Sequence, residues 1–269
     1  MITHGSGPQV GILSEQITRA TALKDRTLDV LDAEIEGMIG YVLMQACRNT
    51  FACDVATLLT QVVVNPFDQA FSIPTKPIGE FVSEDTAKRL QAERGWTFVQ
   101  RTEGFRRLVA SPAPLEIVEL PSIRALINAG VVPICAGGGG IPVLRTDFQL
   151  DGVEAVVDKD SVSSLLAQEL RADLLILLTD VDGLSTGWGN PHARLVRHAP
   201  VDWARRLSLE SGSIAPKVEA CCTFAEATGN PAYIGKLSEA AEVAAGEKGT
   251  RFDLVGNTAD LECPPCVRA

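Results

Sequence analysis

Short apolar runs, each closed by glycine or aspartate, alternate with longer helical stretches, and this alternation constrains the fold more than any other feature of the chain. Thr57–Val64, Val131–Ala136 and Leu174–Thr179 predict buried strands, because continuous apolar strands are typical of parallel sheets covered on both faces. Strand–helix alternation predicts a doubly wound α/β sandwich. Ligands of such sheets bind beyond the carboxyl ends of the strands, where this sequence places its glycine-rich loops.

Helices are predicted between the strands. Asp160 and Ser161 are candidate caps for the helix that follows them. Ser122–Ala129 predicts a short helix before the second strand, and Val218–Ala227 predicts one near the end of the chain. Phe67–Pro114, rich in proline, threonine and charge, breaks the pattern and predicts an excursion from the sheet, such as a lid or a small subdomain.

Two loops have the composition of an anion site. Gly137–Gly140 directly follows a predicted strand, and four consecutive glycines are so costly in backbone entropy that close approach of the backbone to a ligand is the favoured interpretation. Thr3–Pro8 contains two more glycines and ends at a proline suited to a helix start, which would aim the positive end of that helix at the loop. Alone, this second signal is weak. No Walker A loop and no G-x-G-x-x-G fingerprint occurs.

Charged residues stand next to these loops and strands. Lys159 lies between two aspartates before a predicted helix, Lys217 follows a flexible turn, and Lys76 is held between two prolines. Asp180 and Asp182 end the strongest predicted strand, where they would suit a ribose or Mg²⁺. Each lysine alone is more often a surface charge. Together they suit phosphoryl transfer, which needs positioning and positive charge more than covalent help.

Composition and charge exclude several classes of function and location. A net charge of −10 disfavours nucleic acid as a partner, and no apolar run is long enough to predict a membrane span. The first residues lack the features of a signal peptide, so the cytoplasm is the expected compartment. Seven cysteines in a chain of 269 residues do not suggest a disulfide framework, and the single C-x-x-C of Cys263 and Cys266 is interpreted as part of a tail.

Eight stretches, in this order, resemble carbamate kinase, a family within the amino-acid-kinase fold, and the resemblance runs from Met1 to about Phe252. The stretches are THGSGPQVG (Thr3–Gly11), EGMIGY (Glu36–Tyr41), PTKPIG (Pro74–Gly79), GFRRLVASP (Gly104–Pro112), AGGGGIPV (Ala136–Val143), GVEAVVDKD (Gly152–Asp160), LTDVDGL (Leu178–Leu184) and GSIAPKVEA (Gly212–Ala220). The combination of PTKPIG, GGGGIPV and VDKD is specific to that family within the wider fold.

The resemblance implies a three-layer αβα sandwich with a mainly parallel central sheet. It also implies an N-terminal lobe over residues 1–170 on the carbamate and phosphate side, with a protruding subdomain at about 67–114. A nucleotide-binding lobe would follow over 171–252, and 253–269 would form a tail. The implied reaction transfers phosphate between ATP and carbamate with Mg²⁺, in a homodimer, and commonly runs toward ATP at the end of arginine breakdown.

The family's functional residues map onto this sequence by motif. Lys76, Lys159, Lys217 and Asp160 would be catalytic; Gly5, Ser6, Gly7, Gly137 and Gly138 would bind substrate or phosphate; Asp180, Asp182, Gly183 and Lys217 would bind the nucleotide. No residue is assigned to a protein-bound metal.

Four departures from the family pattern stand beside these matches. Only Met1 and Ile2 precede the first loop, so the family's opening strand and its Gly-Gly-Asn loop are absent from this sequence. Ser6 replaces an asparagine, Glu36 replaces a glutamine and Ala215 replaces a glycine. Glu36 would add negative charge near an anion site if it faces inward, and Ala215 would cost about 1 kcal/mol or more if its position needs a positive φ.

Three hypotheses follow. The first is an active carbamate kinase whose opening part is not included in this sequence, and the retained lysines and glycine loops motivate it. The second is a catalytically impaired relative that acts as a dimerising or nucleotide-binding protein, and it is motivated by the missing strand, Glu36 and Ala215. The third is another kinase of the same fold, acting on acetylglutamate, uridylate or a similar acid, against which the PTKPIG stretch argues.

Overall fold

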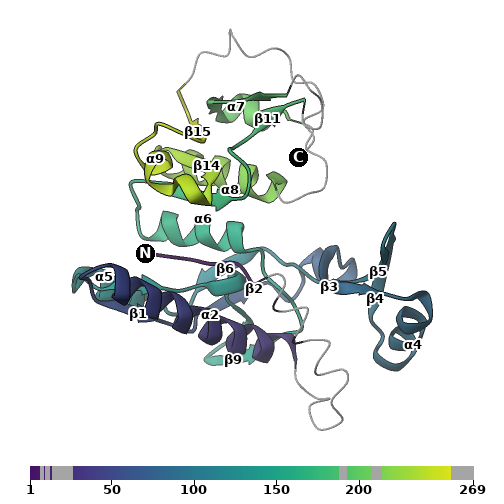
Figure 1. Ribbon diagram of the computed structural model, residues 1–269. Coiled ribbons are helices and arrows are strands. Elements are labelled where there is room, and N and C mark those ends of the chain that lie inside the picture. The colour runs from purple at the N-terminus through teal and green to yellow at the C-terminus, as the bar shows by residue number, and fades with distance from the viewer. Residues whose placement is uncertain (7–8, 10–12, 14–26, 188–192, 208–213, 256–269) are drawn as a thin grey trace. The chain divides into compact units, whose positions relative to one another are not determined.

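Helices and sheets form two units, unit 1 (Met1–Val162) and unit 2 (Ser163–Ala269), and each is described by itself. The structure is a computed structural model that describes residues 1–6, 9, 13, 27–187, 193–207 and 214–255 (Figure 1). The division falls inside helix α6 (Lys159–Glu169). The lobe boundary at residue 170 stays a prediction.

Unit 1 contains two sheets beside its subdomain. In the first, β1 (Val55–Thr57) pairs in parallel with β7 (Val132–Ile134), and Ile2 adds a parallel bridge to Ile134. The second has the order β6-β2-β8-β9, formed by β6 (Pro114–Ile117), β2 (Gln61–Val64), β8 (Ile141–Thr146) and β9 (Gln149–Gly152), with β2 and β8 parallel and the other pairs antiparallel.

The single strand predicted over Thr57–Val64 is wrong in one respect, because the structure divides it into β1 and β2. Across the three residues between them, the chain stops pairing with β7 and begins to pair with β8. The backbone N–H of Leu58 donates to the carbonyl of Ile134 at 2.9 Å, whereas the carbonyl of Thr60 accepts from the N–H of Ile141 at 2.8 Å. The apolar run is continuous in sequence, but it serves two sheets.

Helix α2 (Leu28–Thr50) packs on β1, β7 and β8. Its buried residues Leu28, Leu31 and Ile35 form a core with apolar side chains of the subdomain and of the segment before α6. The helix approaches β1 closely at Gly40, where an added Cβ would collide with the side chain of Thr57. Helices α3 (Gln69–Ser72) and α5 (Leu120–Asn128) complete this part, and α5 confirms the helix predicted over Ser122–Ala129.

The excursion within Phe67–Pro114 contains a three-stranded antiparallel sheet of order β3-β5-β4, formed by β3 (Lys76–Val82), β5 (Gly104–Val109) and β4 (Thr97–Arg101). Helix α4 (Glu84–Arg94) connects β3 to β4; Ser83 caps its start by accepting from the N–H of Thr86, and Gly95 ends it with a φ of 68°. Figure 1 shows this sheet and α4 standing apart from the other strands of unit 1.

Unit 2 has a four-stranded sheet of order β10-β14-β15-β13, formed by β10 (Leu175–Thr179), β14 (Ala232–Lys236), β15 (Thr250–Asp253) and β13 (His198–Pro200). β10 and β14 are parallel, and β10 confirms the strand predicted over Leu174–Thr179. A small pair, β11 (Ser185–Thr186) and β12 (Arg194–Leu195), lies outside this sheet. The helical elements are α7 (Val201–Ala204), α8 (Ile214–Thr228), η3 (Leu237–Glu239) and α9 (Ala240–Ala244).

Helices α8 and α9 both pack on β14, and the core between helix and sheet includes Phe224 and Phe252, which are fully buried. Each such side chain contributes about 1.5–3 kcal/mol through its burial. The mixed α/β class predicted from the sequence is confirmed. Within the described residues, no helix combines the length and apolar character needed to cross a membrane.

Candidate active site

The loop Thr3–Ser6 is placed by Ile2, which forms an isolated parallel bridge to Ile134. Ile2 runs beside β7, donating to the carbonyl of Pro133 at 2.9 Å and accepting from the N–H of Cys135 at 3.0 Å. The carbonyl of His4 then accepts from the N–H of Gly138 at 2.8 Å, so the first loop lies against the four-glycine loop. The buried Ser6 belongs to this contact, whereas Gly5 lies against the side chain of Lys159. Gly7 and the helix predicted from Pro8 lie outside the described residues.

The four-glycine loop, Gly137–Gly140, is in close contact with protein atoms on several sides. A Cβ at Gly137 would collide with the ring of His4, and one at Gly138 would collide with Oγ of Ser6. A Cβ at Gly139 would collide with the carbonyl oxygen of Val157 and lie 3.2 Å from the backbone nitrogen of Lys159. The last three glycines also have positive φ. Close backbone approach, predicted from the sequence, therefore joins this loop to the first loop and to the start of α6.

Lys76 reaches the same turn from the subdomain. Its Nζ lies 3.1 Å from Oδ2 of Asp158 and 3.4 Å from the carbonyl oxygen of Val157. Lys76 is the first residue of β3, and Pro77 follows it, so the strand start fixes the direction of the side chain.

Asp158, one of the two aspartates that flank Lys159, caps α6. Its Oδ1 accepts from the N–H groups of Asp160 and Ser161 at 3.0 and 3.1 Å, so the predicted cap at Asp160 or Ser161 is wrong by two or three residues. Burial would raise the pKa of Asp158, but the charge of Lys76 and these hydrogen bonds outweigh it and hold the pKa below its ordinary value. An aspartate directly before a predicted helix is a signal from which this cap could have been found. Its ion pair could not, because Lys76 is remote in sequence.

Lys159 begins α6 and extends over the first loop. A Cβ added at Gly5 would lie 2.9 Å from Nζ of Lys159, so the ammonium group lies close against the backbone of this loop. Asp160 is buried beside it in the first turn of α6. Unit 1 thus gathers Gly5, Ser6, Lys76 and Lys159 around the turn before α6, beside Gly137 and Gly138.

Glu36 and Asp32 are buried acidic residues of α2 near these loops. Glu36 is 1% exposed, and its carboxylate accepts from the N–H of Thr60 at 3.0 Å and from that of Gly137 at 2.8 Å. The inward orientation considered from the sequence is therefore confirmed. Asp32 is 4% exposed, and neither of its carboxyl oxygens has a hydrogen-bond partner in the described part of the chain. Burial raises the pKa of Asp32 well above its ordinary value, which favours the neutral acid.

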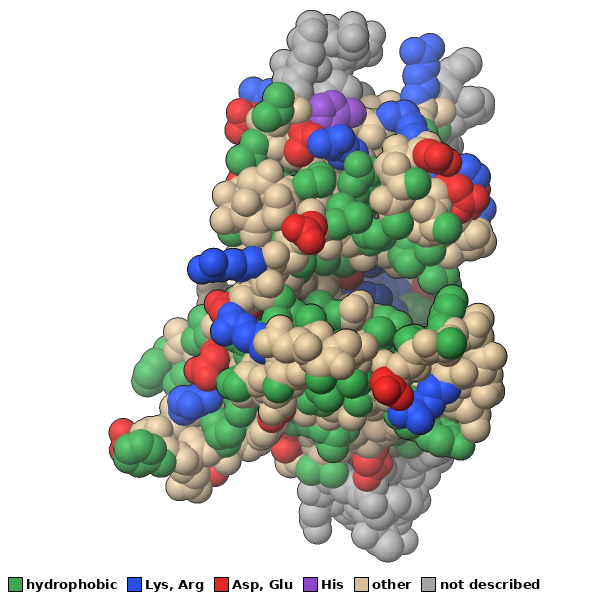
Figure 2. Space-filling view, turned by 90° about the vertical axis from the view of Figure 1, so that its left-hand side faces the viewer, with side chains coloured by type: hydrophobic (Ala, Val, Ile, Leu, Met, Phe, Trp, Pro, Cys, Tyr) green, Lys and Arg blue, Asp and Glu red, His purple; other side chains and the backbone are tan. Residues whose placement is uncertain are grey.

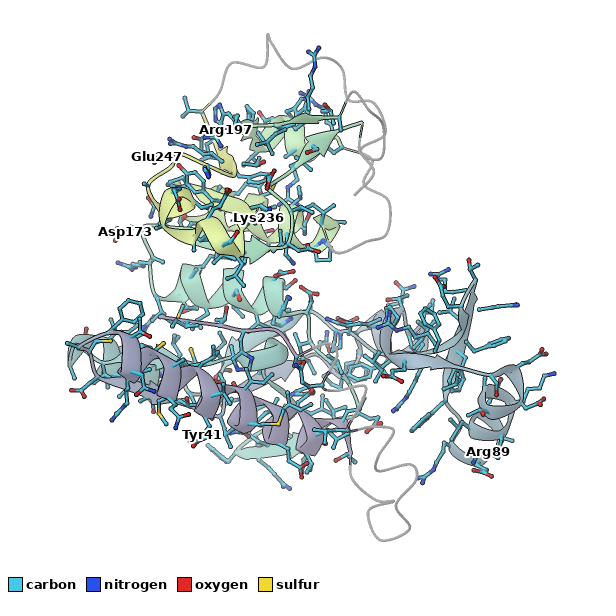
Figure 3. The ribbon with its side chains drawn as sticks, in the orientation of Figure 1. Tyr41, Arg89, Asp173, Arg197, Lys236 and Glu247 are labelled. Carbon is cyan, nitrogen blue, oxygen red and sulfur yellow. The ribbon has the colours of Figure 1, made fainter. Side chains whose placement is uncertain are left out.

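Unit 2 holds the predicted nucleotide residues. Asp180 and Asp182 are exposed after the carboxyl end of β10, and Oδ1 of Asp182 lies 3.6 Å from Nζ of Lys236. Lys236, labelled in Figure 3, is the last residue of the parallel neighbour β14. Gly183 has a φ of 153°, and a Cβ there would lie 2.6 Å from Oγ1 of Thr250. Lys236 was missed because nothing in its local sequence marks it.

Lys217 is buried in the first turn of α8, within a helix that also contains Ala215. Ala215 is not among the residues with positive φ, so the strain considered for this position does not arise. Lys217 belongs to unit 2, whereas Lys76 and Lys159 belong to unit 1. The convergence of the three lysines stays a prediction.

The chain belongs to the amino acid kinase family, whose model matches residues 1–236. Within that class, its relatives are carbamate kinases. The carbamate kinase of Haemophilus influenzae is 44% identical over 255 residues, covering 94% of this chain and 82% of that protein. The carbamate kinase of Escherichia coli K12 is 42% identical over 254 residues, covering 94% and 84%.

A solved structure agrees with these relatives. Carbamate kinase from Giardia lamblia bound to AMP-PNP matches with a TM-score of 0.84 and 38% identity, covering 93% of this chain and 83% of that chain. The three-layer fold of the amino acid kinases is thereby confirmed for this chain.

Proposed function

We propose that this protein is a carbamate kinase, which transfers a phosphoryl group reversibly between ATP and carbamate. The observation that carries the proposal is the gathering of Lys76 and Lys159 at one turn of unit 1, beside two glycine loops. Two ammonium groups and backbone N–H donors are suited to stabilise the negative charge of a transferring phosphoryl group. The similarity to carbamate kinases over more than nine-tenths of the chain supports this substrate.

The chemistry balances as a single displacement. Toward ATP, an oxygen of the β-phosphate of ADP attacks the phosphorus of carbamoyl phosphate, the bond from phosphorus to the carbamate oxygen breaks, and carbamate leaves with the electron pair. Lys76 would contact the transferring group, and Lys159 and Lys217 would bind phosphate oxygens. Asp160 would orient lysines, while backbone groups of Gly5, Ser6, Gly7, Gly137 and Gly138 would position the acceptor side.

The nucleotide side of the proposal rests on unit 2. Asp180, Asp182 and Gly183 follow β10 at the strand end where α/β sheets bind ligands. A structural relative carries AMP-PNP, which supports ATP and ADP as the nucleotides.

We infer that Mg²⁺ enters with the nucleotide. Among the described residues no group of three or more His, Cys, Asp and Glu side chains could hold a metal ion. Mg²⁺ in kinases is commonly bound by substrate phosphates, waters and one or two carboxylates, which fits a chain without a preformed cage in its described part. The ion would neutralise charge on the phosphates.

We also place the protein in the cytoplasm. The five cysteines in the described part of the chain, Cys47, Cys53, Cys135, Cys221 and Cys222, are free thiols, as is usual in a reducing compartment. Fractionation of the source cells, with the protein found in a membrane or secreted fraction, would contradict this assignment.

A coupled assay tests the function. The purified chain, given ADP, Mg²⁺ and carbamoyl phosphate, should form ATP, and Lys76→Ala should lower kcat by about 100-fold or more, because a positioned cation is lost from the transferring group. Lys88→Ala is the matched control, since Lys88 lies in the same subdomain and pairs with Glu84 at the surface. A folded chain that makes no ATP, or a Lys76→Ala variant as active as Lys88→Ala, would contradict the proposal.

A further inference from the structure

Glu36 joins two separate segments of unit 1 through a buried carboxylate. It lies in the third turn of α2, and its two oxygens point in different directions: Oε2 accepts from the N–H of Thr60, and Oε1 accepts from the N–H of Gly137. At 1% exposure, water cannot substitute for either bond. A single side chain thus satisfies one donor from the β1–β2 connection and one from the four-glycine loop.

Thr60 extends this contact to the residue before the loop. Its Oγ1 accepts from the N–H of Ala136 at 2.8 Å, and its carbonyl accepts from the N–H of Ile141 at 2.8 Å. Ala136 has a φ of 51°, a left-handed conformation that is unfavourable for a residue with a Cβ. The entry to Gly137–Gly140 is therefore held in an unfavourable conformation by hydrogen bonds that depend on Thr60 and Glu36.

A loop of four glycines has no side chains with which to fix itself. Its position depends on backbone bonds and on close contacts, which here involve His4, Ser6 and the backbone of Lys159. If the bond from Gly137 to Glu36 is lost, the surface that supports Ser6 and the start of α6 loses its anchor.

We propose that Glu36 is a positioning residue, which holds the four-glycine loop against the Thr3–Ser6 loop and the start of α6 through its two buried hydrogen bonds. The inference rests on the proposed function for its kinetic consequences, but not for its structural ones. Both groups that face the carboxylate are donors, and only the ionised form offers two acceptors and no donor. Glutamine, the family's usual residue at this position, keeps one acceptor, whereas an apolar side chain keeps none.

Several titratable groups surround this carboxylate. His4 comes from the first loop, Asp32 lies one turn earlier on α2, Glu119 stands directly before α5, and Cys135 follows β7. Burial raises the pKa of Glu36 to about 7, against the opposing effect of its hydrogen bonds to Thr60 and Gly137, and the charge of Glu119 adds to the rise. The ionised form should therefore decline as the pH falls below about 7.

The test compares Glu36→Leu, which removes both acceptors, with Glu34→Leu on the exposed side of the same helix and with Glu36→Gln, which restores the family's usual residue. Hydrogen exchange followed by mass spectrometry reports on the peptide that contains residues 135–140. We expect faster exchange of this peptide in Glu36→Leu only. In the parent the exchange should slow as the pH falls from 8 to 6, after correction for intrinsic exchange rates, because a carboxyl group whose pKa is raised by burial favours the closed loop at low pH. Kinetically, Glu36→Leu should raise the KM for carbamoyl phosphate about tenfold, the cost of one charged hydrogen bond, with the KM for ADP unchanged.

The place of the change separates positioning from general stability. Faster exchange in Glu36→Leu should be confined to residues 135–140, and Glu36→Gln should recover both the slow exchange and the low KM. Equal exchange and equal kinetics in Glu36→Leu and Glu34→Leu would overturn the inference. If Glu36→Leu fails to fold, a parent whose exchange in residues 135–140 does not slow as the pH falls would overturn it instead. A parent that exchanges as expected but makes no ATP would contradict the proposed function and leave the positioning role standing.

Discussion

Single residues in unit 1 combine two tasks, and Asp158 is the clearest case. One of its oxygens caps α6, and the other pairs with Lys76. The two tasks can be separated, because asparagine is a good helix cap that carries no charge. The sequence contained both Lys76 and Asp158, but only the fold shows that the lysine at the start of β3 reaches this cap.

Asp158→Asn should lower kcat about tenfold with little change in the free energy of unfolding, because Lys76 loses its charged partner while α6 keeps its cap. Asp158→Ala should lose about 1 kcal/mol of stability in addition. Urea unfolding and the coupled assay, run on both variants, measure the two effects. Equal stability losses in the two variants would show that the cap bond matters less than the ion pair.

Glu36 should make stability depend on pH in a particular direction. Its pKa is raised in the fold, from an ordinary 4.5 to about 7, so its contribution is fully present below about pH 4.5 and is lost as the pH rises through 7. The free energy of unfolding of the parent, relative to Glu36→Gln, should fall by up to about 3 kcal/mol over that range. Urea midpoints of both proteins at pH 5, 6, 7 and 8 provide the measurement. Parallel curves would mean that the carboxyl group titrates normally.

Among the elements, the subdomain sheet and the segment Glu154–Asp158 form one connected region. Arg107 of β5 pairs with Glu154 at 2.9 Å, the N–H of Val156 donates to the carbonyl of Ala110 at 3.0 Å, and Lys76 of β3 pairs with Asp158. Glu154 also accepts from the N–H of Leu28 at the start of α2. The subdomain is therefore anchored to the segment that leads into α6.

Arg107→Met should loosen this anchorage, because it removes the ion pair with Glu154 and the stacking on Trp96, whose ring centre lies 3.6 Å from the guanidinium carbon. We expect kcat/KM for carbamoyl phosphate to fall several-fold and trypsin to cut the subdomain faster. Arg101→Met, at an exposed position of β4, is the control. Unchanged proteolysis in Arg107→Met would show that the sheet is held by its other contacts.

The sequence predicted elements better than it predicted their ends and contacts. The apolar run LILLT predicted β10 correctly, because all of its residues belong to one strand of one sheet. The equally apolar run from Thr57 to Val64 contains parts of two sheets, and nothing in its pattern marks the change at residues 58–60. Glycine content located the loops and motif matches located the lysines. Asp32 and Lys236, and the pairing of Asp158 with Lys76, were missed because their surroundings come from remote parts of the chain.

At the scale of the whole molecule, α2 presents an apolar face that fits the expected homodimer. Tyr41 and Val42 are each 56% exposed, and Met38 lies one turn earlier on the same side. Tyr41 is labelled on α2 in Figure 3, and Figure 2 shows hydrophobic side chains grouped on a face of unit 1. Large exposed apolar groups along one helix commonly mark protein–protein contacts.

Replacing both Met38 and Val42 by glutamate should convert a dimer to a monomer, because two charges would be buried in the contact. Light scattering after gel filtration measures the mass, and Leu237→Glu, at an exposed position of η3, is the control. A parent protein that is already monomeric at micromolar concentration would contradict the homodimer.

The stacking of Trp96 on the buried Arg107 provides an intrinsic optical reporter. Trp203 is enclosed in the core of unit 2, so its emission should be insensitive to events at the subdomain. In a protein with Trp188→Phe and Trp203→Phe, the fluorescence of Trp96 should be quenched and blue-shifted while Arg107 stacks on its ring. It should become brighter and shift to the red when the stacking is lost. Titration of carbamoyl phosphate into such a protein would then show, without any attached dye, whether substrate changes the packing of the subdomain on the segment Glu154–Asp158.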